Sequence, residues 1–293
     1  MCDHYQFVTD ASADLIPEFA ERENIYVIPM TYMIGDQEYV SDGRVSAEVL
    51  QQFYQAEREG KLTRTSQIAP QVYMDCFRSY AEKGESVLYL SLSGGLSGTY
   101  NTAQFAAQEI MAEFPDVKIL CVDSRSATVG LQLLLEKAAE NRAAGMSLQD
   151  NAQWLEENRL KVCHWFMVDD LHYLKLNGRI SPATALIGSA LNIKPILRIE
   201  NEGHLINFGK KRGPKAALNQ LLEFYQGASQ HPEGERVIIV HAGNQDAADY
   251  LEEEVRKRNP GCVLTRAVLT PVIGCHTGPG LCAIAHFGQR IPD

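Results

Sequence analysis

Residues 91–99 (SLSGGLSGT) form the most distinctive local sequence of the chain. Three glycines let the backbone approach a ligand closely, and three serines and a threonine supply hydroxyl groups. The segment lies between a predicted strand over residues 86–90 and a predicted helix over residues 100–114, whose free N–H groups would face it. This arrangement predicts a seat for an anion; the alternative is a flexible turn with ordinary helix capping.

Two catalytic motifs that use similar loops do not fit this segment. A Walker loop ends in Gly-Lys-Ser/Thr, which is missing here. Around Ser97 the order Gly-Leu-Ser-Gly-Thr places the second glycine one position too early for a hydrolase nucleophile elbow. An enzyme that uses Ser97 as nucleophile and His276 as base is therefore kept only as an alternative.

Hydroxyl groups also occur at residues 65–67 (TSQ), ahead of another predicted helix. Thr65 and Ser66 either contribute to a binding site or form a plain capping loop. His276, within segment 274–280 (GCHTGPG), has the chemistry to donate to an anion or to accept a proton. The alternative for a lone histidine in an apolar segment is a hydrogen-bonded core residue.

Basic residues stand out at two places in the second half of the chain. Arg179 follows an Asn-Gly pair and can pair with the C-terminus of the preceding helix. Arg212 ends the run 210–212 (KKR), and Lys215 follows closely. This run is either a solvated surface patch or a docking surface for an anionic partner.

The elements that must position these residues alternate through the first half of the chain. Apolar runs predict strands over residues 5–9, 25–33, 86–90 and 117–122. Segments of helical periodicity predict helices over residues 15–22, 45–57, 70–80, 100–114, 131–144 and, from a capping box at Ser147, 148–158. The alternation predicts an α/β fold in which residues 1–160 form a three-layer domain with a mostly parallel sheet. Ligands bind at the carboxyl edge of such sheets, where segment 91–99 lies.

The pattern changes in the second half. Turn residues 201–203 between apolar runs 193–199 and 204–208 predict a hairpin. Further strands are predicted over 162–168, 237–241 and 263–269, and helices up to 176 and over 181–191, 215–226 and 246–256. Segment 270–287 is Gly-rich and apolar and receives no assignment. Residues 161–293 are therefore predicted to form an α+β domain with a mixed or antiparallel sheet.

Composition excludes several classes of protein. The 293 residues carry a formal net charge of -10, which disfavours a nucleic-acid surface and anything beyond transient membrane contact. No apolar run approaches a membrane span, and the start of the chain does not resemble a signal peptide. The 7 cysteines are scattered without zinc-type spacing, which indicates reduced thiols, no metal site and a cytoplasmic location.

Eight segments together resemble the DegV family, in order and along the whole chain. In the first half they are residues 7–15 (FVTDASADL), 27–30 (VIPM), 65–67 (TSQ), 95–100 (GLSGTY) and 122–124 (VDS). In the second half they are residues 174–181 (LKLNGRIS), 192–197 (NIKPIL) and 274–280 (GCHTGPG). The chain departs from the family pattern at Ala11, where serine is commoner, and at residues 213–214 (GP), which interrupt the basic stretch around Arg212.

The resemblance implies a bacterial, non-enzymatic lipid carrier without a cofactor. It would bind a long-chain fatty acid such as palmitate, stearate or oleate and present it to a separate ATP-dependent fatty acid kinase, which forms the acyl phosphate. Matched motifs imply that Thr65 and Ser97 hold the carboxylate, with Ser66, Gly98 and His276 nearby. Arg179 and Arg212 match positions tied to kinase engagement or phosphoryl transfer.

The resemblance leaves two questions of interpretation. The aliphatic segments 186–191, 193–197 and 269–273 are candidate walls of a tunnel for the acyl chain, and the alternative is ordinary core. Besides the enzyme alternative, the chain could be a regulatory module whose lipid is only structural.

Overall fold

The computed structural model describes residues 5–181 and 192–290. The predicted helix over 181–191 and the predicted tunnel wall over 186–191 fall on residues 182–191, outside the described part.

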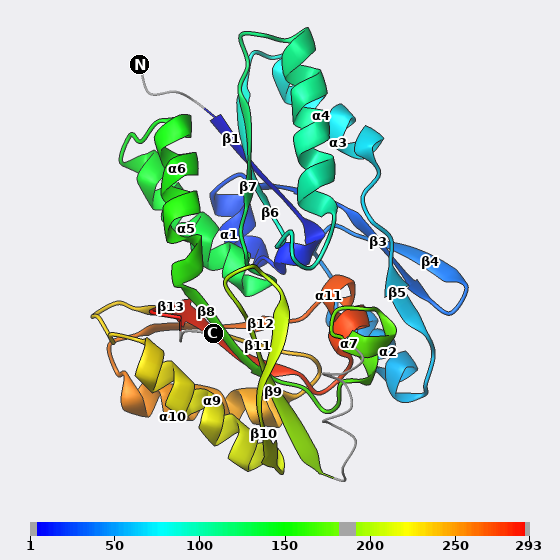
Figure 1. Ribbon diagram of the computed structural model, residues 1–293, viewed down its shortest axis with the longest axis vertical. Helices are drawn as coiled ribbons and strands as arrows, with labels where there is room; N and C mark the ends of the chain where they lie inside the picture. Colours follow the sequence, from blue (N-terminus) through cyan, green and yellow to red (C-terminus); the bar gives the residue numbers. More distant parts are fainter. Residues whose placement is uncertain (1–4, 182–191, 291–293) are drawn as a thin grey trace.

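A four-stranded parallel sheet, sheet A, forms the core of the first half, in the order β2-β1-β6-β7. Its strands are β1 (Tyr5–Asp10), β2 (Tyr26–Ile28), β6 (Ser86–Ser91) and β7 (Ile119–Asp123). Alternate residues of β6 point to opposite faces, as a period of two requires. Val87 and Tyr89 pack with helices α3 and α4, whereas Leu88 and Leu90 pack with α5 and α6. The predicted three-layer arrangement is confirmed (Figure 1).

The helices of this layered unit follow the predicted segments closely. They are α1 (Pro17–Arg22), α2 (Ala47–Arg58), α3 (Pro70–Ala81), α4 (Thr99–Glu113), α5 (Val129–Ala143) and α6 (Leu148–Asn158), with the short turn η1 (Ala11–Ala13). The N-cap bond of the predicted capping box is present, because Asp150 N donates to Ser147 Oγ at 3.1 Å.

A small antiparallel sheet, sheet B, corrects the sequence prediction. Its strands are β3 (Met30–Ile34), β4 (Gln37–Ser41) and β5 (Thr63–Thr65), in the order β4-β3-β5. The single strand predicted over 25–33 is wrong: it divides at Pro29 into β2 of sheet A and β3 of sheet B. Thr65, predicted in a loop, is the last residue of β5.

The second half contains a mixed six-stranded sheet, sheet C, in the order β10-β9-β8-β13-β11-β12. Its strands are β8 (Val162–Met167), β9 (Ile193–Ile199), β10 (Leu205–Arg212), β11 (Arg236–His241), β12 (Val263–Val268) and β13 (Cys282–Phe287). Within sheet C, β11 and β12 pair in parallel, and the other neighbouring strands pair antiparallel. Helices α9 (Pro214–Ala228) and α10 (Gln245–Arg258) cover one face, and α5 packs on the other (Figure 1).

Short elements connect the two halves. They are η2 (Arg159–Lys161), α7 (His172–Leu176) and α11 (Pro271–Thr277). Helix α11 lies in the unassigned segment 270–287 and packs against β3, β5 and α2 of the first half. Sheets A and B use residues 5–123 and sheet C uses residues 162–287; the domain boundary at residue 160 stays a prediction.

Two features are absent from residues 5–181 and 192–290. No helix there combines the length and apolar character that crossing a membrane requires. Within the same ranges, no group of three His, Cys, Asp or Glu side chains is arranged to hold a metal ion.

Candidate functional site

A cavity lies between the α5-facing side of sheet C and the carboxyl edge of sheet A. Its empty volume is about 880 Å³, including the open space at its mouth. Most of its lining is aliphatic, with side chains such as Leu174, Leu269 and Leu281. Of two segments predicted as tunnel walls, residues 269–273 contribute Leu269, Val272 and Ile273, whereas residues 193–197 do not line the cavity.

Five neighbouring strands of sheet C contribute to the wall: β10, β9, β8, β13 and β11. At a spacing of about 4.8 Å between strands, the cavity spans on the order of 19 Å across the sheet. Ala283 and Ala285 of β13 face it near the centre of this span. Because alanine has the smallest side chain available to a strand with a fixed pleat, these two positions leave space where larger residues would close it.

A polar cluster interrupts the apolar wall. Thr65, from the end of β5, and His276, from α11, place Oγ1 and Nε2 2.8 Å apart. Ser97 and Arg179 line the same cavity. The structure therefore places four of the seven predicted site residues in the wall of one cavity, from segments as much as 211 positions apart.

Histidine 276 is neutral in this environment. Burial, reinforced by the nearby positive charge of Arg179, lowers the pKa of His276 to about 3. Its Nδ1 is buried and has no hydrogen-bond partner in the described part of the chain. Beside the guanidinium of Arg179, the cluster thus offers neutral hydroxyl and imidazole groups.

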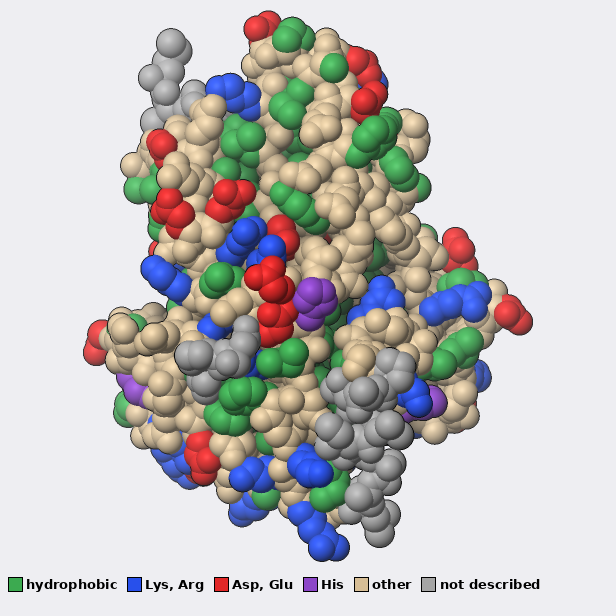
Figure 2. All heavy atoms as spheres, viewed as in Figure 1, with side chains coloured by type: hydrophobic (Ala, Val, Ile, Leu, Met, Phe, Trp, Pro, Cys, Tyr) green, Lys and Arg blue, Asp and Glu red, His purple; other side chains and the backbone are tan. Residues whose placement is uncertain are grey.

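The remaining predicted site residues do not line the cavity. Ser66 is exposed, and its N–H donates to the Thr31 carbonyl at 3.1 Å. Gly98 is exposed at the N-cap of α4. Arg212 is the exposed last residue of β10. Figure 2 shows Lys and Arg side chains at the lower end of the molecule, where Figure 1 shows β10. The roles predicted for these three residues stay predictions.

The geometry does not favour Ser97 as a nucleophile. Its Oγ lies 2.7 Å from Thr99 Oγ1 and accepts from Thr99 N at 3.3 Å. The Nε2 of His276 bonds instead to Thr65. A serine nucleophile needs a base within hydrogen-bond reach, and this pair does not provide one.

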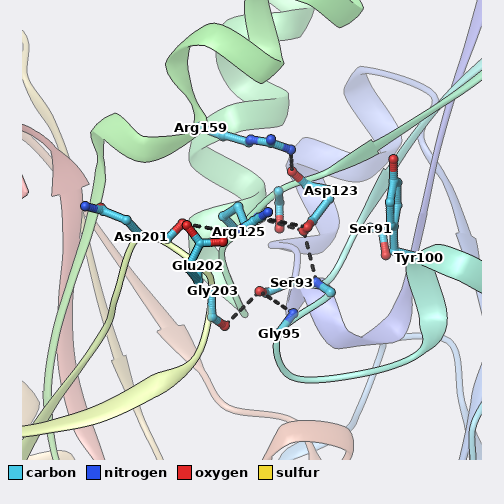
Figure 3. Close-up of polar contacts among 12 residues, drawn as sticks. Ser91, Ser93, Gly95, Tyr100, Asp123, Arg125, Arg159, Asn201, Glu202 and Gly203 are labelled. Atoms are coloured by element: carbon cyan, nitrogen blue, oxygen red, sulfur yellow. Dashed lines mark hydrogen bonds and ion pairs between the residues drawn. The ribbon is translucent and has the colours of Figure 1, made fainter.

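The loop that carries Ser97 is held by Ser93. The Ser93 carbonyl accepts from Leu96 N at 3.0 Å and from Ser97 N at 3.2 Å. Its hydroxyl accepts from Gly95 N at 3.2 Å and donates to the Gly203 carbonyl at 2.8 Å (Figure 3). Ser93 therefore joins the loop to the tip of the β9–β10 hairpin.

Arg125 fixes the same hairpin tip from the other side. Its guanidinium pairs with Asp123 and with Glu202, each at 3.0 Å, and donates to the Asn201 carbonyl at 3.1 Å (Figure 3). The Asp123 carboxylate also accepts from Gly94 N at 3.0 Å. The hairpin of sheet C is thus bound to the carboxyl edge of sheet A, beside the loop of Ser97.

A Gly95→Ala variant is expected to displace the hairpin tip. A Cβ at Gly95 would lie 2.6 Å from the Gly203 carbonyl carbon, a backbone atom that cannot rotate away. We expect a loss of about 1–3 kcal/mol in the free energy of unfolding and faster amide exchange in the hairpin, measured by denaturation and hydrogen-exchange mass spectrometry.

Gly227→Ala is the matched control, because this glycine lies in α9 with no atom within 4 Å of a new Cβ. It should leave hairpin exchange unchanged and stabilise the protein by up to about 1 kcal/mol. Unchanged hairpin exchange in Gly95→Ala would contradict the docking role of this contact.

A buried carboxyl group, that of Glu57, lies next to β5, the strand that ends at Thr65. Glu57 of α2 accepts from Thr63 Oγ1 at 2.8 Å, and its Oε2 has no hydrogen-bond partner among residues 5–181 and 192–290. Burial raises the pKa of Glu57 to about 8. The folded protein therefore keeps a proton on Glu57 at pH values where the unfolded chain, with an ordinary glutamate pKa, has lost it.

Stability should consequently fall as pH rises from about 4.5 to about 8 through this group. Glu57→Gln has no ionisable group at this position, so the variant does not lose this stability. Its unfolding free energy minus that of wild type should therefore increase by about 2–4 kcal/mol between pH 5 and pH 8.5. Denaturant titrations at both pH values measure it. Glu59→Gln, two residues further on and exposed at the C-cap of α2, is the control. A pH-independent difference for Glu57→Gln would refute the argument.

Sequence reasoning missed other polar residues of the cavity. Ser12, Thr128 and His164 all line it. His164 is only 8% exposed, in β8. The available signal was a polar residue at an inward position of an otherwise apolar strand.

The fold and the cavity define a class: α/β proteins in which a parallel and a mixed sheet enclose an apolar cavity with a polar cluster in its wall. The family model described as uncharacterised protein of the DegV family matches residues 4–289. The chain belongs to the DegV family.

Individual proteins agree with this assignment. The DegV domain-containing protein CPE0026 of Clostridium perfringens is 36% identical over 96% of both chains. A DegV family protein of Thermus thermophilus, described for its fatty acid binding, is 29% identical with a TM-score of 0.87, over 98% of this chain and 100% of that one. The Streptococcus pneumoniae fatty acid kinase (Fak) B3 protein, loaded with linoleic acid, shares the fold at 21% identity, with a TM-score of 0.84 over 98% of this chain and 100% of that one.

Proposed function

We propose that this chain binds a long-chain fatty acid in the cavity and presents its carboxylate to a separate, ATP-dependent fatty acid kinase in the cytoplasm. The observation that carries the proposal is one cavity that joins an aliphatic wall to the cluster of Thr65, Ser97 and His276. The fatty acid binding described for the Thermus thermophilus relative supports the same ligand class.

The acyl chain supplies most of the binding energy. Each CH₂ removed from water contributes about 0.8 kcal/mol, so some sixteen carbons give around 10 kcal/mol before ordering costs. A span on the order of 19 Å across five strands suits a long acyl chain such as that of palmitate, stearate or oleate.

The polar cluster satisfies the head of the ligand. A carboxylate in an apolar cavity must be hydrogen-bonded, and the hydroxyls of Thr65 and Ser97 can donate to it. The neutral imidazole of His276 donates its Nε2 proton to Thr65 Oγ1, 2.8 Å away, which leaves the Thr65 hydroxyl proton free for the carboxylate. Such donors leave the carboxylate oxygen nucleophilic enough to attack a phosphorus atom, which the kinase would supply from ATP.

Native mass spectrometry of the protein purified from a bacterial host tests the ligand. We expect an adduct of fatty-acid mass that is released on denaturation. Protein that carries no adduct, and that takes up none of palmitate, stearate or oleate when these are added, would exclude fatty acid binding.

Arg179→Ala tests presentation to the kinase. In the proposed reaction Arg179 stabilises the transferring phosphoryl group, and exposed Arg212 contacts the kinase. With a fatty acid kinase and ATP, we expect Arg179→Ala to reduce acyl-phosphate formation by at least about a hundredfold while fatty acid affinity changes little. An equal loss of both would refute the division of roles, and turnover by the chain alone would favour an enzyme.

A further inference from the structure

The cavity contains a second polar position, at His164, separate from the cluster of Thr65, Ser97 and His276. His164 lies on β8, opposite Ala285 of β13, and only 8% of it is exposed. In the part of the chain that the structure describes, neither ring nitrogen makes a hydrogen bond of good geometry. The backbone of Ala127 provides one nitrogen with a hydrogen bond of weaker geometry. Buried polar groups normally have a partner, so the second nitrogen of this imidazole, in an aliphatic wall, indicates a missing one.

The start of α5 brings a second polar group to the same position. The His164 ring packs on the first turn of this helix, where a Cβ at Gly130 would lie 2.0 Å from Nε2. Thr128, the N-cap residue, also lines the cavity, and its side chain does not cap the helix. One glycine and one threonine thus let an imidazole and a hydroxyl reach the cavity together.

The charge state of His164 limits what it can bind. Burial is the main cause that lowers the pKa of His164 to about 3, and the positive charge of Arg290 acts in the same direction. The backbone of Ala127 acts in the opposite direction. A neutral imidazole has one donor and one acceptor nitrogen and no charge to balance a second carboxylate. A hydroxyl group on the ligand suits it, because such a group is neutral and can donate to an acceptor nitrogen or accept from a donor nitrogen. An oxo group can only accept, so it suits the donor nitrogen or the Thr128 hydroxyl.

We propose that His164 and Thr128 form a subsite for a hydroxyl or oxo group carried on the acyl chain, so that the ligands include hydroxylated long-chain fatty acids. The inference rests on the proposed function, because the carboxylate of the same ligand must occupy the cluster of Thr65 and Ser97. In an aliphatic tunnel without such a subsite, a hydroxyl would be buried without a partner and the hydroxylated acid would be rejected.

Calorimetric titration with stearic acid and a series of hydroxystearic acids, differing in the position of the hydroxyl, tests the subsite. The quantity measured is the ratio of the Kd of each hydroxylated acid to that of stearic acid. For at least one isomer, His164→Leu is expected to raise this ratio at least about tenfold over wild type, since the hydroxyl loses its partner. His164→Gln, which keeps a donor and an acceptor, should leave the ratio close to its wild-type value.

His241→Leu is the matched control. His241 lies in β11 of the same sheet, is 4% exposed and has an Nε2 without a hydrogen bond among the described residues, yet it does not line the cavity. Its replacement should leave the ratio unchanged. The ratio is taken within one protein, so a general loss of stability does not imitate the expected result.

The outcomes separate the two proposals. If His164→Leu changes the ratio by less than tenfold for every isomer, the subsite is refuted and fatty acid binding stands. If His164→Leu does not fold, Thr128→Val takes its place under the same criterion, and His164→Gln should keep a ratio close to that of wild type. If neither stearic nor hydroxystearic acid binds the wild-type protein, the proposed function itself fails.

Discussion

Replacing Ala285 with phenylalanine is expected to weaken the binding of stearate by about a thousandfold. Ala285 is fully buried on β13 and lines the cavity opposite His164. A phenyl ring there occupies space that the acyl chain would fill. Excluding about five methylenes at about 0.8 kcal/mol each removes roughly 4 kcal/mol of binding free energy, which corresponds to the expected loss.

The series Ala285→Val, Ala285→Leu and Ala285→Phe, titrated with saturated acids of decreasing length, distinguishes a filled cavity from a damaged fold. As the side chain grows, the longest acid should be lost first and shorter acids should keep their affinity. Ala216→Phe, at an exposed position of α9, should change nothing. Equal losses for long and short acids would show that the cavity does not hold the acyl chain.

Local sequence patterns were sufficient to predict most of the elements but not every strand. The alternation in β6 and the capping box at Ser147 depend on neighbouring residues alone, so they can be recognised without the rest of the fold. Segment 282–287 received no assignment because glycines and a proline precede it. It becomes β13, the strand between β8 and β11, only through pairing with residues more than forty positions away.

The site shows the same limit. Hydroxyl-rich loops identify Thr65 and Ser97 as candidates, but no local pattern places Thr65 against His276, 211 residues further on. That grouping was expected only through the resemblance to the DegV family. His164 escaped notice because a single histidine in an apolar strand has the pattern of a core residue, and its missing partners are visible only in three dimensions.

Removing both hydroxyls of the polar cluster is expected to weaken the binding of a fatty acid by at least about a hundredfold. In Thr65→Val with Ser97→Ala, a carboxylate in the cavity loses two neutral donors. Hydrogen bonds to a charged group contribute about 1.5–3 kcal/mol each, and an apolar wall offers no water to replace them. Calorimetric titration with stearate at neutral pH measures the loss.

The corresponding alcohol, octadecanol, separates the head from the tail of the ligand. Its chain is buried in the same way, but its neutral hydroxyl needs less compensation than a carboxylate, so the double variant should weaken its binding far less. Thr31→Val, on β3 and outside the cavity lining, controls for loss of a threonine hydroxyl close to β5. If stearate and octadecanol lose affinity equally, Thr65 and Ser97 shape the cavity without holding the carboxylate, and the anion must sit elsewhere along its wall.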